Sequence, residues 1–187
     1  MKSFTLSKDT AGLLIIDVQE RLVDTVERSC EILQTMLKLI QGMQILNVPV
    51  FVTEQYPEGL GPTITPIKNI LGPQQTYLAK TCFSGLREEE VKNALAKSPI
   101  TQWILVGIEA HVCVLQTAKD LLAQEAQVTV LNDAISSRSI YDFSTAIAEM
   151  RDIGVRVSSA ETVLFELVGD SKSMHFKSIS QLIKSCR

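Results

Sequence analysis

Short runs of Val, Ile and Leu without polar alternation constrain this chain most. The clearest runs cover residues 12–18, 49–53, 103–108 and 128–132, and residues 77–80 and 155–158 are weaker candidates. Apolar runs of this length are typical of strands that are buried on both faces of a parallel sheet. We therefore expect these segments to be strands.

The segments between these runs carry apolar residues at helical spacing. The clearest is 31–46, and the same test predicts helices over 88–96, 114–124, 139–151 and 176–185, with Ser139 as an N-cap. Strands that alternate with such helices predict an α/β fold with helices on both faces of the sheet. Segment 56–75 holds four prolines and three glycines, which predicts a long surface loop that serves as a lid or an oligomer contact.

The length and the net charge of the chain limit how many domains it can have and what kind of partner it can bind. A chain of 187 residues without repeats or linkers predicts a single domain over residues 1–187. The formal net charge of −3 and the lack of like-charge runs argue against a nucleic-acid or membrane partner and favour a small-molecule substrate. The apolar run 11–16 is too short for a signal peptide or a membrane span, so we expect a cytoplasmic protein. Its four cysteines, Cys30, Cys82, Cys113 and Cys186, should stay thiols there.

Three polar residues follow the predicted strands. Asp17 ends the first run, Lys80 ends residues 77–80, and Cys113 lies between residues 103–108 and a predicted helix. Ligands of open parallel sheets bind beyond the carboxyl ends of the strands, so these side chains are expected to converge. A cysteine can attack as thiolate, a carboxylate can take its proton, and a cation lowers its pKa. The set predicts nucleophilic catalysis.

Each of these residues also has a structural interpretation. Asp17 can cap a helix, Lys80 can be an ordinary solvated lysine, and Cys113 can be a small buried hydrophobe. Position alone does not decide between the two interpretations of any one of them.

Other residues compete for a catalytic role. Cys82 is a rival nucleophile, but in a strand it would share a face with Lys80 and would lack a helix N-terminus of its own, so Cys113 is favoured. His111 lies two residues from Cys113 in a tight loop, where the side chains diverge, and a structural supporting role is expected. His175 is expected at the surface or at a helix start. The motifs GxGxxG, GxxxxGK[ST] and GxSxG are absent, which argues against a nucleotide-binding oxidoreductase and a serine α/β-hydrolase.

These motifs together resemble a known family. LLIIDVQE, a lysine that ends the third strand, and GIEAHVCV are similar to the isochorismatase-like cysteine hydrolases, and EQYPEGLGPT, KTCFS, DAISSRS and ETVLFEL resemble its isochorismatase-domain-containing subgroup. The resemblance implies a three-layer, Rossmann-like fold with a six-stranded parallel sheet flanked by helices. It implies Asp17, Lys80 and Cys113 as the catalytic residues and a homodimer or larger homo-oligomer.

The resemblance also implies details of the site. A non-proline cis peptide would join Ile108 to Glu109, and its amide would form an oxyanion hole with the Cys113 N–H. Members that cleave the isochorismate vinyl ether commonly lack the cysteine, so Cys113 favours hydrolysis of a C–N bond in a small amide-like or imine-like metabolite. The predicted substrate-pocket residues are Glu54, Gln55, Tyr56 and Phe83.

The second strand is followed by no histidine, unlike the metal-binding nicotinamidases, so we expect neither a metal nor another cofactor. The main alternative function is a non-catalytic oligomeric scaffold or a redox-sensing protein that retains the fold.

Overall fold

The computed structural model describes residues 5–185, so Cys186 lies outside the described part. Its centre is a six-stranded parallel sheet in the order β3-β2-β1-β4-β5-β6. The strands are β1 (Ala11–Ile16), β2 (Val50–Gln55), β3 (Tyr77–Lys80), β4 (Gln102–Ile108), β5 (Gln127–Ser136) and β6 (Arg156–Ser158). The predicted α/β class and six-stranded sheet are confirmed.

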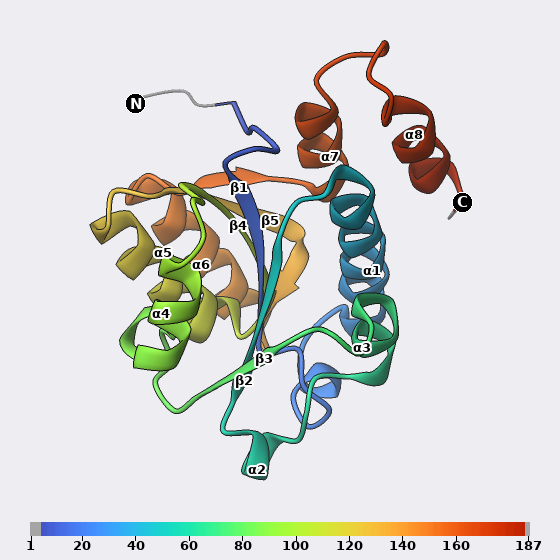
Figure 1. The fold of residues 1–187 in the computed structure, drawn as a ribbon. Coiled ribbons are helices and arrows are strands. Elements are labelled where there is room, and N and C mark those ends of the chain that lie inside the picture. Colours follow the sequence, from blue (N-terminus) through green and yellow to red (C-terminus); the bar gives the residue numbers. More distant parts are fainter. Residues whose placement is uncertain (1–4, 186–187) are drawn as a thin grey trace.

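Helices cover both faces of this sheet (Figure 1). One face carries α1 (Ser29–Leu46), α3 (Thr65–Leu71), α7 (Ala160–Val168) and α8 (Phe176–Lys184), and the other carries α4 (Glu89–Ala96), α5 (Leu115–Ala123) and α6 (Ile140–Asp152). Successive side chains of a strand point to opposite faces. In β1, Leu13 and Ile15 therefore join the first core, while Leu14 and Ile16 join the second. None of the helices in residues 5–185 is both long and apolar enough to cross a bilayer.

Two parts of the chain differ from the prediction. Segment 56–75 is not one long loop, because it contains the short helices α2 (Pro57–Leu60) and α3. A proline lies in the first turn of each, where its missing N–H is tolerated and its fixed φ favours the helix. Helix α7 is absent from the predicted set, although its buried residues recur at helical spacing and Ser159 caps its N-terminus through a bond from Thr162 N.

The backbone turns sharply just after three of the strands, at the carboxyl edge of the sheet. Asp17, Tyr56 and Glu109, which directly follow β1, β2 and β4, have left-handed φ values of 56°, 37° and 61°. The other non-glycine residues with positive φ that the structure describes, Arg28, Asn47 and Glu125, lie at or just beyond helix ends. A left-handed conformation strains a residue with a side chain, typically by about 1–3 kcal/mol, and such residues cluster at functional sites.

Candidate active site

Asp17 lies at the centre of this edge and is buried. Its two carboxylate oxygens accept hydrogen bonds from two different side chains: Thr53 Oγ1 donates to Oδ1 at 2.7 Å, and Lys80 Nζ donates to Oδ2 at 2.7 Å. Neither oxygen caps a helix in these bonds, so the helix-capping interpretation does not apply. The carboxylate instead joins β1, β2 and β3.

Lys80 is equally buried, and it is not a solvated lysine. Its ammonium group also donates to Gln55 Oε1 at 2.6 Å and to the carbonyl oxygen of Phe83 at 3.1 Å, with the Cys82 carbonyl oxygen at 3.3 Å. Both members of the Lys80–Asp17 ion pair are removed from solvent, with side-chain exposures of 0% and 1%. Removing one partner of such a pair leaves an uncompensated buried charge and typically costs about 3–5 kcal/mol.

Cys113 is buried in a single π-helical turn, Ala110–Val114, that leads directly into α5. The pKa of Cys113 is raised to about 12, mainly by burial and then by the neighbouring Asp17 carboxylate, which together outweigh the lowering effect of the Lys80 ammonium group. The resting side chain is therefore a neutral thiol beside a carboxylate. The three predicted residues do come together, and a reaction of Cys113 requires removal of its proton.

The competing residues lie to the side of this group. Cys82 is half-buried, and its Sγ faces the carbonyl oxygen of Arg87 at 3.7 Å. His111 Nδ1 bonds Ser137 Oγ at 2.9 Å, which fits the expected supporting role. His175 precedes α8 as its N-cap residue, as expected for a helix start.

The expected cis peptide is not present. All peptide bonds in residues 5–185 are trans, including the bond between Ile108 and Glu109. The chain turns instead through the left-handed Glu109, which is less costly than a non-proline cis bond at about 3–4 kcal/mol. The carbonyl oxygen of Glu109 accepts from Val112 N at 2.9 Å and so closes the turn before Cys113.

A cavity of about 170 Å³ lies over Cys113. Its walls are mainly apolar, and its lining residues are Asp17, Leu22, Gln55, Leu60, Phe83, Ile108, Glu109, Val112, Cys113 and Arg138. For comparison, an engineered protein cavity of about 150 Å³ holds benzene. The space suits a small molecule.

Two of the four predicted pocket-wall residues line this cavity and two do not. Gln55 and Phe83 are in place. Glu54 is buried under the segment that follows β2, where it accepts a hydrogen bond from Thr63 N at 2.6 Å, and Tyr56 is exposed. The reason is the alternation along β2: Thr53 and Gln55 face Asp17 and Lys80, so Glu54 between them faces away.

Several residues of the site were not predicted. Gln19 is buried, accepts from Gln55 N at 2.7 Å and donates to the carbonyl oxygens of Gln55 and Gly61, so it fixes the chain on which Gln55 and Leu60 lie. The sequence signal that could have identified Gln19 is its place in the DVQ motif directly after β1. For Arg138, a cavity-lining residue that was also not predicted, the only sequence signal is its position in the DAISSRS motif.

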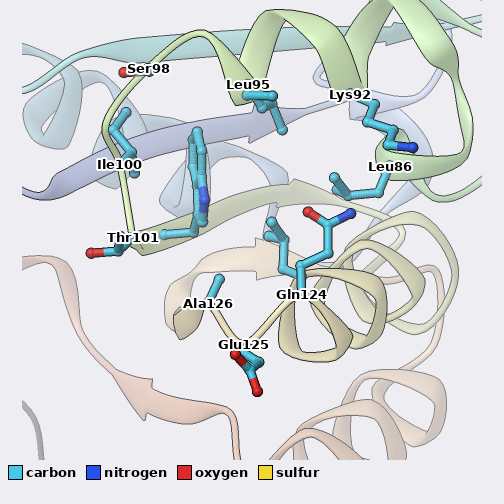
Figure 2. A pocket seen from close by; sticks show the side chains of 12 residues that line it. Leu86, Lys92, Leu95, Ser98, Ile100, Thr101, Gln124, Glu125 and Ala126 are labelled. Atoms are coloured by element: carbon cyan, nitrogen blue, oxygen red, sulfur yellow. The ribbon is translucent and has the colours of Figure 1, made fainter.

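A larger cavity of about 330 Å³ lies elsewhere, between α4, α5 and the start of β4. Leu86, Leu95 and Ile100 form apolar walls, and Lys92 and Glu125 lie at its margin (Figure 2). Its lining residues include no cysteine, so it offers no chemistry like that around Cys113. Residues 5–185 also contain no group of three or more His, Cys, Asp or Glu side chains arranged to hold a metal ion.

A doubly wound parallel sheet carries a thiol, a carboxylate and an ammonium group at its carboxyl edge, which is the arrangement of a hydrolase with a Rossmann-like α/β fold. The sequence model of the isochorismatase domain matches residues 11–162. The chain belongs to the isochorismatase family.

Individual relatives agree with this assignment. Isochorismatase domain-containing protein 2 of Pongo abelii is 40% identical over 92% of this chain and 82% of that protein. Isochorismatase domain-containing protein 1 of Salmo salar is 39% identical over 94% of this chain, which spans only 62% of that protein's length. The solved structure of MAR1 ribonuclease from Caenorhabditis elegans has a TM-score of 0.90 at 38% identity, over 96% of this chain and 92% of that one.

Proposed function

We propose that this chain is a metal-independent cysteine hydrolase that cleaves a C–N bond in a small amide-like or imine-like metabolite. Cys113 is the nucleophile, Asp17 the general base and Lys80 the electrostatic support. The observation that carries the proposal is the neutral, buried thiol of Cys113 beside the Asp17 carboxylate, in the wall of a cavity sized for a small molecule.

The first half of the reaction forms a covalent intermediate. Asp17 accepts the thiol proton while Cys113 Sγ bonds to the substrate's carbonyl carbon, and the C=O electron pair moves onto oxygen. The backbone N–H of Cys113, in the turn that leads into α5, is the proposed donor to this oxyanion, with Glu109 fixing the turn before it. The C–N bond then breaks, the nitrogen takes the proton from Asp17, and a thioester remains.

The second half uses water. Asp17 takes a proton from the water while the water oxygen bonds to the thioester carbon. The C–S bond then breaks, and the proton returns from Asp17 to Cys113 Sγ. For an amide, the products are a carboxylic acid and an amine or ammonia. Lys80 balances the Asp17 charge through the cycle and, through Gln55 and the Phe83 carbonyl oxygen, remains in one position.

The test is a screen of small amides, with release of amine or ammonia measured for wild type and Cys113→Ala, and with the protein mass recorded during turnover. We expect release by wild type alone and a mass increase that matches the acyl group on Cys113. Equal release by the two proteins, or turnover without an adduct on a rapid-quench time course, would overturn the mechanism. Inertness of Cys113 toward every amide and toward alkylating reagents would favour the non-catalytic scaffold alternative.

RNA hydrolysis is the second candidate, because the C. elegans protein at 38% identity is named a ribonuclease. The net charge of −3 and the small, mainly apolar cavity favour a small metabolite instead. Incubation of labelled RNA with wild type and Cys113→Ala decides between them. Cleavage that requires Cys113 would replace the amide by a phosphodiester as substrate.

We also propose that the chain acts as a cytoplasmic homo-oligomer. Exposed apolar side chains near the start of α6, Ile140 and Tyr141, support an interface there, and the free thiols of Cys30, Cys82 and Cys113 are consistent with a reducing compartment. Light scattering on the purified protein and cell fractionation test the two statements. A monomer, or recovery outside the cytoplasmic fraction, would contradict them.

A further inference from the structure

The larger cavity, between α4, α5 and the start of β4, lies at the opposite end of the sheet from Cys113. Strand β4 connects the two places. Trp103, its second residue, lines the larger cavity, and Ile108, its last residue, lines the smaller one. The two cavities share no lining residue, so a molecule in the larger cavity leaves the space over Cys113 free.

The floor of the larger cavity is apolar and its margin is polar. The margin carries the exposed side chains of Lys92 and Glu125 (Figure 2). Ligand pockets in proteins typically combine a mostly apolar lining with a few polar groups, in a volume of about 300–1,000 Å³. The volume of about 330 Å³ falls in this range. The floor is formed by four buried residues of the core on this face of the sheet: Leu86, Leu95, Trp103 and Leu121.

One polar group in this floor has no partner. Trp103 is only 3% exposed, yet its indole Nε1–H donates no hydrogen bond to residues 5–185. The N–H is not fully enclosed either, since the described side-chain atoms that are enclosed without a partner are Thr63 Oγ1 and Thr129 Oγ1. It therefore reaches open space, and the cavity is the space that Trp103 lines. A buried tryptophan usually finds an acceptor for its N–H, so this donor is available to a ligand.

The surrounding residues hold the indole ring in place. Phe51 meets it edge to face, with the ring centroids 5.4 Å apart and the ring planes at 67°. Trp103 also lies in the regular part of the sheet, where it pairs with Gly12 of β1 and Val128 of β5. The pairing of β4 with β5 becomes irregular only beyond Leu105. A donor fixed in this way loses little conformational freedom when an acceptor binds to it.

The charges at the margin favour an uncharged ligand. Lys92 and Glu125 have opposite charges, and no other residue that lines the cavity is charged. An ion on the apolar floor would lose its hydration without gaining a paired charge, which is costly. A neutral acceptor, such as a carbonyl oxygen, bonds the Trp103 N–H without this cost.

We infer that the larger cavity is a second ligand site, which binds an uncharged, mainly apolar molecule with one acceptor oxygen that bonds the Trp103 N–H. Its volume of about 330 Å³ is about twice the roughly 150 Å³ of an engineered cavity that holds benzene. A molecule of two fused rings therefore fits. This site is separate from the proposed hydrolase function and does not depend on it.

The test uses the fact that Trp103 is the only tryptophan of the chain, so the protein has a single indole N–H signal in NMR spectra. Isotope-labelled protein is titrated with tetralone, a ketone of two fused rings, and with tetralin, the same ring system without the oxygen. We expect tetralone to move the indole signal and to bind about threefold to tenfold more tightly than tetralin, as for one hydrogen bond. An unmoved indole signal, or equal affinities, would overturn the inference.

Two matched variants place the binding in this cavity. Ala96→Leu fills it from α4, and Ala148→Leu makes the same change on α6, away from the cavity; both alanines lie on exposed helix faces. Tetralone should bind Ala96→Leu at least about tenfold more weakly and Ala148→Leu as wild type. In Trp103→Phe, ligand signals should show that the preference for tetralone over tetralin is lost. A retained preference, or equal weakening in the two leucine variants, would contradict the site.

The naphthoate ion tests the charge of the ligand, because it has two fused rings and a carboxylate. We expect it to bind more weakly than tetralone, and tighter binding would refute the assignment of an uncharged ligand. Cys113→Ala should leave the affinity for tetralone unchanged, since Cys113 does not line this cavity. Failure of the hydrolase proposal and failure of this second site are therefore distinguishable.

Discussion

Replacing Asp17 by asparagine separates two effects that its carboxylate has on Cys113. In the proposed reaction the carboxylate accepts the thiol proton, so Asp17→Asn should remove hydrolysis. In the resting protein the same negative charge opposes formation of the thiolate, so its loss should lower the pKa of Cys113. The variant is therefore expected to have a more reactive thiol and a less active enzyme.

The structure sets the size of these effects. At about pH 8, a thiol with the ordinary pKa of 9.0 is about one tenth thiolate, whereas Cys113 with a pKa of about 12 is about one part in 10⁴. Alkylation of Cys113 should thus be about 10³-fold slower than that of an exposed cysteine. Burial is the largest cause and remains in the variant, so the pKa will not return to 9.0. Loss of one neighbouring charge should shift it by about one unit, which is a tenfold faster alkylation.

The assay measures iodoacetamide labelling of Cys113 over a range of pH and amide hydrolysis on the same protein samples. Hydrolysis should fall about 10²-fold to 10⁴-fold in Asp17→Asn, as for loss of a general base. Lys80→Met should act oppositely on the thiol, because it removes the charge that lowers the pKa of Cys113. Slower labelling of a folded Asp17→Asn variant, or retention of its hydrolysis, would refute the reasoning.

Folding must be checked in the same variants, because each leaves a buried charge without its partner. The double variant Asp17→Asn/Lys80→Met removes both charges, so it should recover most of the roughly 3–5 kcal/mol that each single variant loses, as measured by denaturant unfolding. It should remain inactive. Recovered stability without recovered hydrolysis would distinguish a catalytic role of the pair from a structural one.

Three further outcomes are expected. Gly107→Ala should lower the free energy of unfolding, measured by urea titration, by about 3 kcal/mol or more. A Cβ at this position would lie 2.2 Å from the Ile16 carbonyl oxygen, and the φ of 143° is unfavourable for a residue with a side chain. A loss below about 1 kcal/mol would contradict this expectation. Burial opposes ionisation of Glu166, but hydrogen bonds from Arg156 and Leu6 N outweigh the effect of burial and lower the pKa of Glu166. The ionised carboxylate therefore stabilises the fold at pH values above its pKa in the unfolded chain. This stabilisation is lost as the pH falls through the pKa in the folded protein. Arg156→Met should flatten the acidic limb of the pH–stability curve, and an unchanged limb would count against the assignment. Cys82→Ser should leave hydrolysis and labelling of the proposed nucleophile within about twofold of wild type, since its Sγ faces a backbone carbonyl oxygen, whereas loss of activity would make it part of the site.

Much of the fold was predictable because burial on both sides of a parallel sheet leaves a plain signal. The apolar runs that become β1 and β4 are buried along their whole length, and the amphipathic segment that becomes α1 buries one stripe against the sheet. Asp17, Lys80 and Cys113 were predictable for a related reason. Asp17 directly follows β1, Lys80 is the last residue of β3 and Cys113 lies shortly after β4, and parallel strands bring their carboxyl ends to one edge.

The residues around this group were less predictable, because a strand's side chains alternate. An error of one position in register exchanges a pocket-facing residue for one that faces the opposite layer, as with Glu54 and its neighbour Gln55. The turn before Cys113 illustrates a second limit. A cis peptide and a left-handed residue are both able to bend the chain sharply, and the local sequence around Glu109 does not distinguish them.

The regular and irregular parts of the sheet therefore determine different properties of the site. The regular strands bring Asp17 and Lys80 together, which is sufficient to arrange the proposed proton transfer with Cys113. The irregular part of β5 comes shortly before Arg138, which lines the cavity.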